Sequence, residues 1–290
     1  MTRGLTMTFL TAVLSVASTT AAPEPVFLKR SVGDVLERPG DLSTATAHYR
    51  PLFGVGDPNA QIVQGLTRFG HLTVDPNGRS RRVSESDEEQ IYYVLDGIGL
   101  LHYGQDTVPI GPDDFVYLPV GIEHGVSNPR ERPLQLMVMG FAIPAGRQVP
   151  PTPKLMLANA ADVPLQILGQ HGPTTQFKLL MGTTRSRRDR LAAAHQVNSL
   201  FLMDFAAGGT NIPHNHRREE EIYYVLRGHG EMVAGTDAQG EEVRYPAQAG
   251  DAFYFAPRTL IGFYSGAKEG QTHDLILAVR WALPSGASRN

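Results

Sequence analysis

Short apolar runs, separated by turns rich in glycine, proline, aspartate and asparagine, recur along this chain. Their length fits β-strands, and long stretches with the spacing of an amphipathic helix are absent. Many short strands divided by such turns favour a barrel or jelly roll in each half of the chain. Residues 184–194 offer the one helical candidate, which we interpret as a basic surface loop or a single helical turn. The clearest apolar runs are residues 115–118, 134–138, 199–205, 252–255 and 275–281.

Two patterns occur twice in the same order. The segment QIYYVLDG at residues 90–97 matches EIYYVLRG at residues 221–228 in five central positions and in the final glycine. A polar–aromatic–basic pattern ending in glycine at residues 48–54 returns at residues 176–182, so the offsets are 131 and 128 residues. Matching patterns at nearly constant offset indicate a duplicated domain.

A proline-rich stretch separates the two copies. Residues 144–153 contain four prolines, which cannot donate to a sheet ladder and favour an extended linker. We therefore predict an N-terminal barrel at residues 23–143 and a C-terminal barrel at residues 154–290. Residues 1–22 combine Arg3, a mostly apolar run and small residues before Pro23, which predicts a signal peptide and a secreted or periplasmic protein.

Composition excludes several function classes. The net charge is −3, from 26 basic and 29 acidic residues, so bulk charge indicates neither nucleic-acid binding nor an anionic membrane surface. No aromatic residues interleave with the arginines of residues 184–194, and no run after the N-terminus is long enough to span a membrane. The absence of cysteine excludes disulfides, thiolate ligands and cysteine nucleophiles. We expect a small-molecule partner and a monomer or homodimer.

Potential metal ligands gather in residues 208–228. Interpreted as two strands joined by a polar turn, this stretch places His214 and His216 on one face, because alternate strand residues share a face. Glu221 begins the neighbouring strand. Two imidazoles and a carboxylate that converge from adjacent strands form a 2-His-1-carboxylate ligand set.

These motifs resemble those of the cupins. The first cupin motif is matched by Gly208, His214, His216, Glu221 and Gly228, and residues 119–128, with His124, resemble the second motif in the first copy. The resemblance covers both copies and implies an all-β bicupin, with two tandem cupin jelly-roll β-barrels.

Each copy departs from the cupin pattern in a different motif. The positions equivalent to His214, His216 and Glu221 in the first copy are Val83, Glu85 and Gln90. We therefore expect His124 to be a hydrogen-bonded core histidine rather than a ligand. In the second copy Ile261 stands at the position of the fourth ligand, a histidine in the family. Three protein ligands with open positions are what a catalytic metal site requires.

Strand alternation also predicts the surroundings of this site. Tyr223 and Val225 follow Glu221 on the same face, and with Phe263 and Ile212 they suggest an apolar, partly aromatic pocket for a small organic ligand. Tyr223 could donate a hydrogen bond or a proton to substrate, or it could be ordinary barrel packing. Arg258 could meet a carboxylate at the barrel mouth, or lie solvated in a turn.

The resemblance and the ligand set together suggest a function. They favour one Fe(II) or Mn(II) ion, with Zn(II) or Ni(II) as alternatives, bound by His214, His216 and Glu221. The leading hypothesis is a metal-dependent, dioxygenase-like oxidoreductase that acts on a small organic substrate. The alternative is a non-catalytic bicupin that binds or stores a sugar or an aromatic molecule.

Overall fold

The computed structural model describes residues 26–58, 60–150, 152, 154–169 and 171–283. The predicted signal peptide at residues 1–22 lies outside this part of the chain, so export stays a prediction, as does the state of monomer or homodimer. Within the described residues, no helix has the length and apolar character needed to cross a membrane.

Nearly all regular structure is β. Apart from strands, the described residues contain two 3-10 turns, η1 (Ala60–Ile62) and η2 (Ala160–Asp162). The strands of the first half are β1 (Phe27–Ser31), β2 (Ala47–Gly54), β3 (Leu66–Val74), β4 (Glu88–Asp96), β5 (Gly99–Tyr103), β6 (Asp106–Ile110), β7 (Asp114–Leu118), β8 (His124–Ser127) and β9 (Leu134–Ala142). Those of the second half are β10 (Met156–Asn159), β11 (Thr175–Thr183), β12 (Leu191–Ala194), β13 (Val197–Phe205), β14 (Glu219–Arg227), β15 (His229–Thr236), β16 (Glu242–Gln248), β17 (Asp251–Phe255), β18 (Ile261–Ser265) and β19 (Asp274–Ala282).

The strands form two barrels, each made of one large and one three-stranded sheet. The first barrel pairs the order β10-β7-β4-β9-β3-β2 with β6-β5-β8, and the second pairs β1-β17-β14-β19-β13-β11-β12 with β16-β15-β18. All five apolar runs named from the sequence lie within strands, and the all-β fold with two jelly rolls is confirmed. The basic stretch at residues 184–194 forms a loop followed by β12, with no helix.

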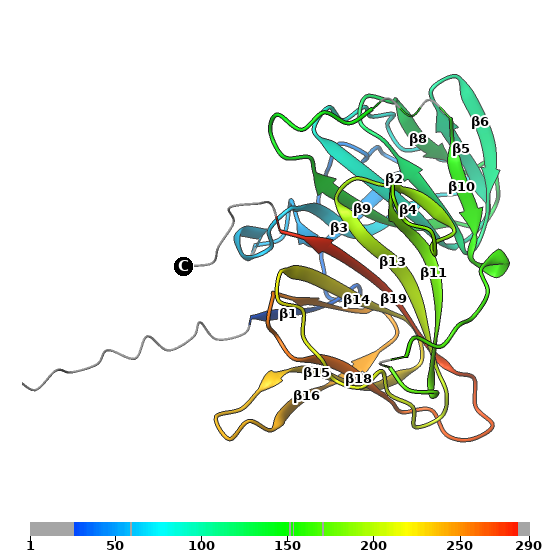
Figure 1. The fold of residues 1–290 in the computed structure, drawn as a ribbon. Coiled ribbons are helices and arrows are strands. Elements are labelled where there is room, and N and C mark those ends of the chain that lie inside the picture. Colours follow the sequence, from blue (N-terminus) through cyan, green and yellow to red (C-terminus); the bar gives the residue numbers. More distant parts are fainter. Residues whose placement is uncertain (1–25, 59, 151, 153, 170, 284–290) are drawn as a thin grey trace, which may run out of the picture.

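Strand alternation divides the buried side chains among three cores. Tyr92 on β4 and Tyr223 on β14 face the interiors of their own barrels, whereas Ile91 and Ile222 point to the opposite face of each sheet. Those opposite faces pack against each other, so a third core lies between the two large sheets. Figure 1 shows this arrangement, with the two large sheets side by side in the middle of the molecule.

The barrels exchange their terminal strands. β1, which precedes the first barrel in sequence, pairs antiparallel with β17 of the second barrel, and β10, which follows the linker, pairs with β7 of the first. Strand pairing therefore crosses the predicted boundaries at residues 143 and 154 in both directions, and the division into 23–143 and 154–290 stays a prediction about the duplicated sequence units.

Two buried glutamates join the barrels in a reciprocal way. Glu89 of β4 is fully buried, and its carboxylate accepts hydrogen bonds from the backbone amides of His195, Gln196 and Val197 at 2.7, 2.7 and 3.2 Å. Glu220 of β14 is likewise buried and accepts from the Gln64 amide at 2.9 Å. Each barrel thus supplies a carboxylate that binds backbone of the other.

Trp281 is the single tryptophan of the chain and lies in the core between the barrels, 1% exposed. Its Nε1 donates to the Gln64 carbonyl oxygen at 2.7 Å. We expect Trp281→Phe to lower the free energy of unfolding by about 1–2 kcal/mol, because it removes a buried hydrogen bond and leaves a small void. Thermal or denaturant unfolding followed by far-UV circular dichroism measures this, and an unchanged stability would contradict the packing described here.

Candidate metal centre

Backbone pairing fixes the segment that carries the two histidines. His214 forms an isolated bridge with Ile261, in which each amide donates to the other residue's carbonyl at 2.9 and 2.7 Å. The Arg258 amide donates to the His216 carbonyl oxygen at 2.7 Å. The predicted continuous strand through both histidines is wrong. Ile212 adopts a φ of 52° and Pro213 has no amide hydrogen, so the ladder is interrupted there.

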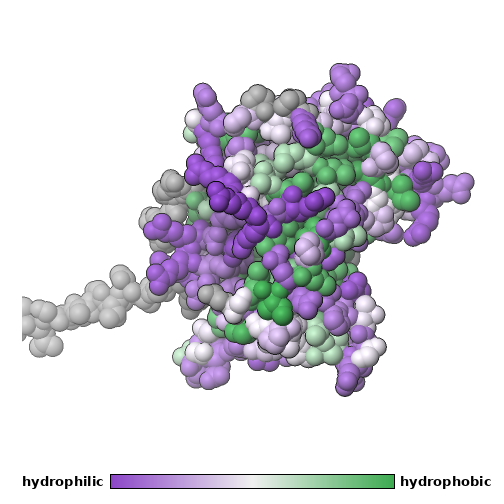
Figure 2. Space-filling model, turned by 45° about the vertical axis from the view of Figure 1, so that its right-hand side comes forward, coloured by the Kyte–Doolittle hydropathy of each residue, from purple (hydrophilic) through white to green (hydrophobic). Residues whose placement is uncertain are grey.

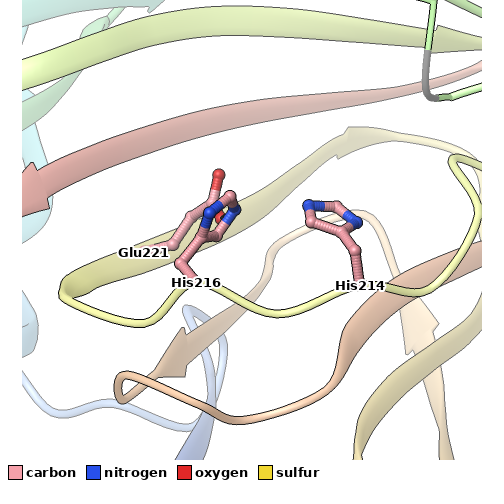
Figure 3. Close-up of side chains that lie close together, drawn as sticks. All are labelled: His214, His216 and Glu221. Carbon is pink, nitrogen blue, oxygen red and sulfur yellow. Dashed lines mark ion pairs between the residues drawn. The ribbon is translucent and has the colours of Figure 1, made fainter.

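The three predicted ligands come together. The ligand atoms of His214, His216 and Glu221 all lie within 4.8 Å of one another, and His216 Nε2 is 3.1 Å from Glu221 Oε2. Figure 3 shows the two imidazoles on the same side of their loop, with the Glu221 carboxylate beside the His216 ring. Two atoms that bind one ion at ~2.1 Å are at most about 4.2 Å apart, so a small side-chain adjustment would close the set around an ion.

The protonation pattern suits a metal. His214 Nδ1 donates to the Ile212 carbonyl oxygen at 3.0 Å, which leaves the Nε2 lone pair available. Burial lowers the pKa of His214, so its imidazole is neutral near pH 7. Glu221 is 1% exposed, and among the described residues neither of its oxygens has a well-directed hydrogen-bond donor. A buried carboxylate without such donors fits a site that takes a cation.

The equivalent place in the first barrel is built differently. There Val83 pairs with His124 as His214 pairs with Ile261, so each barrel keeps one histidine of this backbone pair and replaces the other by an aliphatic residue. His124 Nε2 lies 3.1 Å from Gln90 Oε1, and its Nδ1 donates to the Ile122 carbonyl oxygen at 2.9 Å. His124 is therefore the hydrogen-bonded core histidine that the sequence favoured.

Charge pairing replaces ligands around Gln90. Gln90 donates to Glu88 at 2.7 Å, and Glu88 Oε1 lies 2.8 Å from Arg68 Nε. Arg68 also pairs with Asp41 at 2.6 Å and, at 3.8 Å, with Glu85, the residue equivalent to His216. The carboxylates near the first barrel's degenerate motif are thus paired with Arg68, and two of the three positions that carry ligands in the second barrel hold Val83 and Gln90 instead.

A cavity of about 220 Å³ opens beside the second barrel's cluster. Its walls combine apolar and aromatic side chains with polar and charged ones, and His214, Glu221 and Tyr223 are among its lining residues. Val225, Phe263 and Ile212, which the sequence predicted as pocket residues, are not among the residues that line this cavity. Val225 and Phe263 are fully buried in the barrel core, and Ile212 is half-exposed, with its carbonyl accepting the hydrogen bond from His214. Arg258 is exposed in its turn. The remaining lining residues are Leu168, Gly169, His171, Phe177, Leu179, Arg188, Ser199, Phe201, Met203, Asn211 and Arg280.

Tyr223 lines this cavity with a constrained hydroxyl. Its Oη accepts from Asn211 Nδ2 at 3.1 Å, and Asn211 Oδ1 in turn accepts from the Phe263 amide at 2.8 Å. Burial raises the pKa of Tyr223 well above its usual value, and the nearby Glu221 carboxylate raises it further. The phenol therefore keeps its proton and has it available as a hydrogen-bond donor.

The sequence interpretation missed two further groups beside the ligands. His171 packs edge-on against His214, with ring centroids 4.9 Å apart, and its Nδ1 donates to the Asn211 carbonyl oxygen at 2.8 Å. Arg280 places its guanidinium 3.2 Å from His216 Nε2 and 3.5 Å from Glu219 Oε1. In the sequence, the one signal for Arg280 was that a charged residue stands inside the apolar run 275–281. Nothing in the loop around His171 indicated that this residue lies beside the ligands.

Comparison with known proteins identifies the relatives of this architecture. A family profile described as the cupin domain matches residues 70–140 and 201–265, one region in each barrel. A putative glyoxylate-induced protein from Pseudomonas aeruginosa superimposes with a TM-score of 0.71 at 15% identity, covering 95% of this chain and 96% of that one. The protein Ylba from E. coli gives 0.66 at 14% identity, with 91% and 94% covered.

An enzyme is among the similar structures. A mutant of the Bacillus subtilis oxalate decarboxylase superimposes with a TM-score of 0.62 at 14% identity, covering 88% of this chain and 76% of that one. No curated protein sequence matches the chain. At these identities the structural likeness establishes the shared fold, and the chemistry of the site has to be argued from the residues themselves.

Proposed function

This chain is a two-domain cupin, and we propose that its second barrel binds one divalent first-row metal ion and acts as a metal-dependent enzyme on a small organic substrate. The observation that carries the proposal is the convergence of His214, His216 and Glu221 beside the 220 Å³ cavity, which His214 and Glu221 line. Fe(II) or Mn(II) are the favoured ions, because two imidazoles and a carboxylate leave open positions that suit them.

A bound ion would supply Lewis acidity and, if redox-active, electrons for dioxygen, which is why we favour a dioxygenase-like oxidoreductase. The protein supplies the surroundings. Phe177, Phe201 and Met203 form an apolar part of the cavity wall, and the Tyr223 hydroxyl can donate a hydrogen bond to a substrate oxygen. Ile261 occupies the place of a fourth ligand, so one more coordination position stays open to substrate.

Elemental analysis of protein prepared without a nickel column tests the metal. We expect about one Fe or Mn ion per chain, since the described residues contain one such ligand cluster. Dialysis against a chelator should lower the unfolding temperature, and added Fe(II) or Mn(II) should restore it, because an ion that binds only the folded state stabilises that state. Protein that carries no metal, and gains no thermal stability from either ion, would contradict the proposal.

The second candidate is a non-catalytic barrel that binds a small molecule without metal. One observation favours it: the Arg280 guanidinium lies 3.2 Å from His216 Nε2, so a cation already contacts one of the candidate ligands. Ligand binding that survives complete metal removal, together with no turnover in the presence of metal, would favour this function over the enzyme.

A further inference from the structure

A row of polar residues crosses the large sheet of the second barrel beside the candidate metal centre. Cross-strand pairing places Glu221 of β14 opposite Arg280 of β19, Arg280 opposite Ser199 of β13, and Ser199 opposite Gly182 of β11. Neighbouring strands are ~4.8 Å apart, so this row extends roughly 14 Å from the carboxylate ligand to Gly182. Glu221, Arg280 and Ser199 all line the 220 Å³ cavity.

Polar atoms in this row lack hydrogen-bond partners among the described residues. Ser199 is 1% exposed and its Oγ has none. Arg280 Nε is buried and has no well-directed acceptor, although Glu219 Oε1 lies 3.5 Å away. A buried hydroxyl without a partner costs free energy that a bound ligand can recover. Two donors that share one cavity therefore indicate a bound acceptor.

A second arginine reaches the cavity from the loop between β11 and β12. Gly182 has no side chain, and the loop folds back over it, with the buried Asp189 carboxylate against Gly182 and bonded to Ser186 Oγ. The Arg190 amide donates to the Leu179 carbonyl oxygen at 3.0 Å, which holds the loop to β11. Arg188 lines the cavity from this loop with a half-exposed side chain, and its ion pair with Asp189 is long, at 3.7 Å.

The charges lining the cavity are unbalanced. Among the lining residues two guanidinium groups stand against the single carboxylate of Glu221; Glu219 and Asp189, which lie 3.5 and 3.7 Å from them, do not line the cavity. Guanidinium binds carboxylate through paired hydrogen bonds, and a serine hydroxyl adds a third donor. The remaining wall, with Phe177 and Phe201, suits an apolar or aromatic body.

We propose that Ser199, Arg280 and Arg188 form an anion subsite next to the metal position, and that the substrate is a small organic carboxylate with an apolar or aromatic body. The carboxylate accepts hydrogen bonds from the Arg280 and Ser199 side chains, and Arg188 closes the outer end of the subsite. The identification of the bound molecule as the substrate rests on the proposed function. The anion subsite itself is expected in the protein with or without metal.

Calorimetric titration with benzoate, and with its neutral analogue benzamide, tests the subsite in metal-free and metal-loaded protein. We expect benzoate to bind at least about tenfold more tightly than benzamide, because a carboxylate makes charge-assisted hydrogen bonds. Arg188→Ala should weaken benzoate binding by about tenfold, and Ser199→Ala by about threefold to tenfold. Neither substitution should change benzamide binding by as much.

Arg187→Ala is the matched control, because Arg187 is an exposed arginine of the same loop that does not line the cavity. Loss of benzoate binding in Arg188→Ala but not in Arg187→Ala supports the subsite. Equal binding of benzoate and benzamide, no binding of benzoate, or equal effects of the two arginine substitutions would overturn it. Metal content is also measured on protein that has been offered Fe(II) and Mn(II). A chain that takes up neither ion and still selects benzoate refutes the proposed function and leaves the subsite standing.

Discussion

His216→Ala is expected to reduce the bound metal to a trace and to abolish any metal-dependent turnover. Loss of one of three protein ligands removes a coordinate bond, and the affinity should fall by more than about a hundredfold, since even outer-shell changes cost 10–100-fold. Glu221→Gln should act as strongly, because it replaces the one anionic ligand of the cluster by a neutral amide. Elemental analysis and calorimetric titration with Mn(II) measure both effects.

His124→Ala provides the control from the first barrel. His124 is a buried histidine at the position equivalent to Ile261, bonded to Gln90 and the Ile122 carbonyl. Because His124 is buried and hydrogen-bonded, unfolding is measured alongside, and the metal content of the folded protein should equal that of the native chain. Metal retained in His216→Ala and lost in His124→Ala would place the ion in the first barrel and refute the assignment to the second.

Glu89→Ala is expected to lower the free energy of unfolding by about 3–5 kcal/mol, because it leaves several buried hydrogen-bond donors without an acceptor. Besides the amides of residues 195–197, the Tyr117 hydroxyl donates to this carboxylate at 2.9 Å. Alanine would leave these groups buried without their acceptor and open a void between the barrels. Glu89→Gln keeps one acceptor oxygen and should cost less, about 1–3 kcal/mol.

Denaturant unfolding followed by the fluorescence of Trp281 measures this loss, since the indole lies in the same inter-barrel core. Glu131→Ala is the matched control, because Glu131 is an exposed glutamate of the first barrel, and its removal should change stability by less than about 0.5 kcal/mol. A loss in Glu89→Ala as small as that of the control would show that these hydrogen bonds do not hold the barrels together.

Much of the candidate centre could be predicted from local pattern. The identical segments IYYVL in β4 and β14 indicated the duplication, and the alternation of inward and outward residues correctly placed Glu221 and Tyr223 on one face. The continuous strand predicted through His214 and His216 was wrong, because Ile212 and Pro213 interrupt it, although both imidazoles still lie on the same side of their loop. The ligands nevertheless converge, because backbone pairing with β18 holds the histidine segment in place.

The sequence by itself determined the two β-barrels and the set of three candidate ligands, because both depend on residue type and on spacing within short stretches of chain. Only the tertiary structure decided which residues surround those ligands. Ser199, Arg280 and Glu221 meet through the register of three strands that are far apart in sequence, and Arg188 and His171 arrive on loops. The tertiary structure also decided the exchange of β1 and β10 between the barrels. Register and loop placement follow from how whole sheets pack, and no local pattern encodes them.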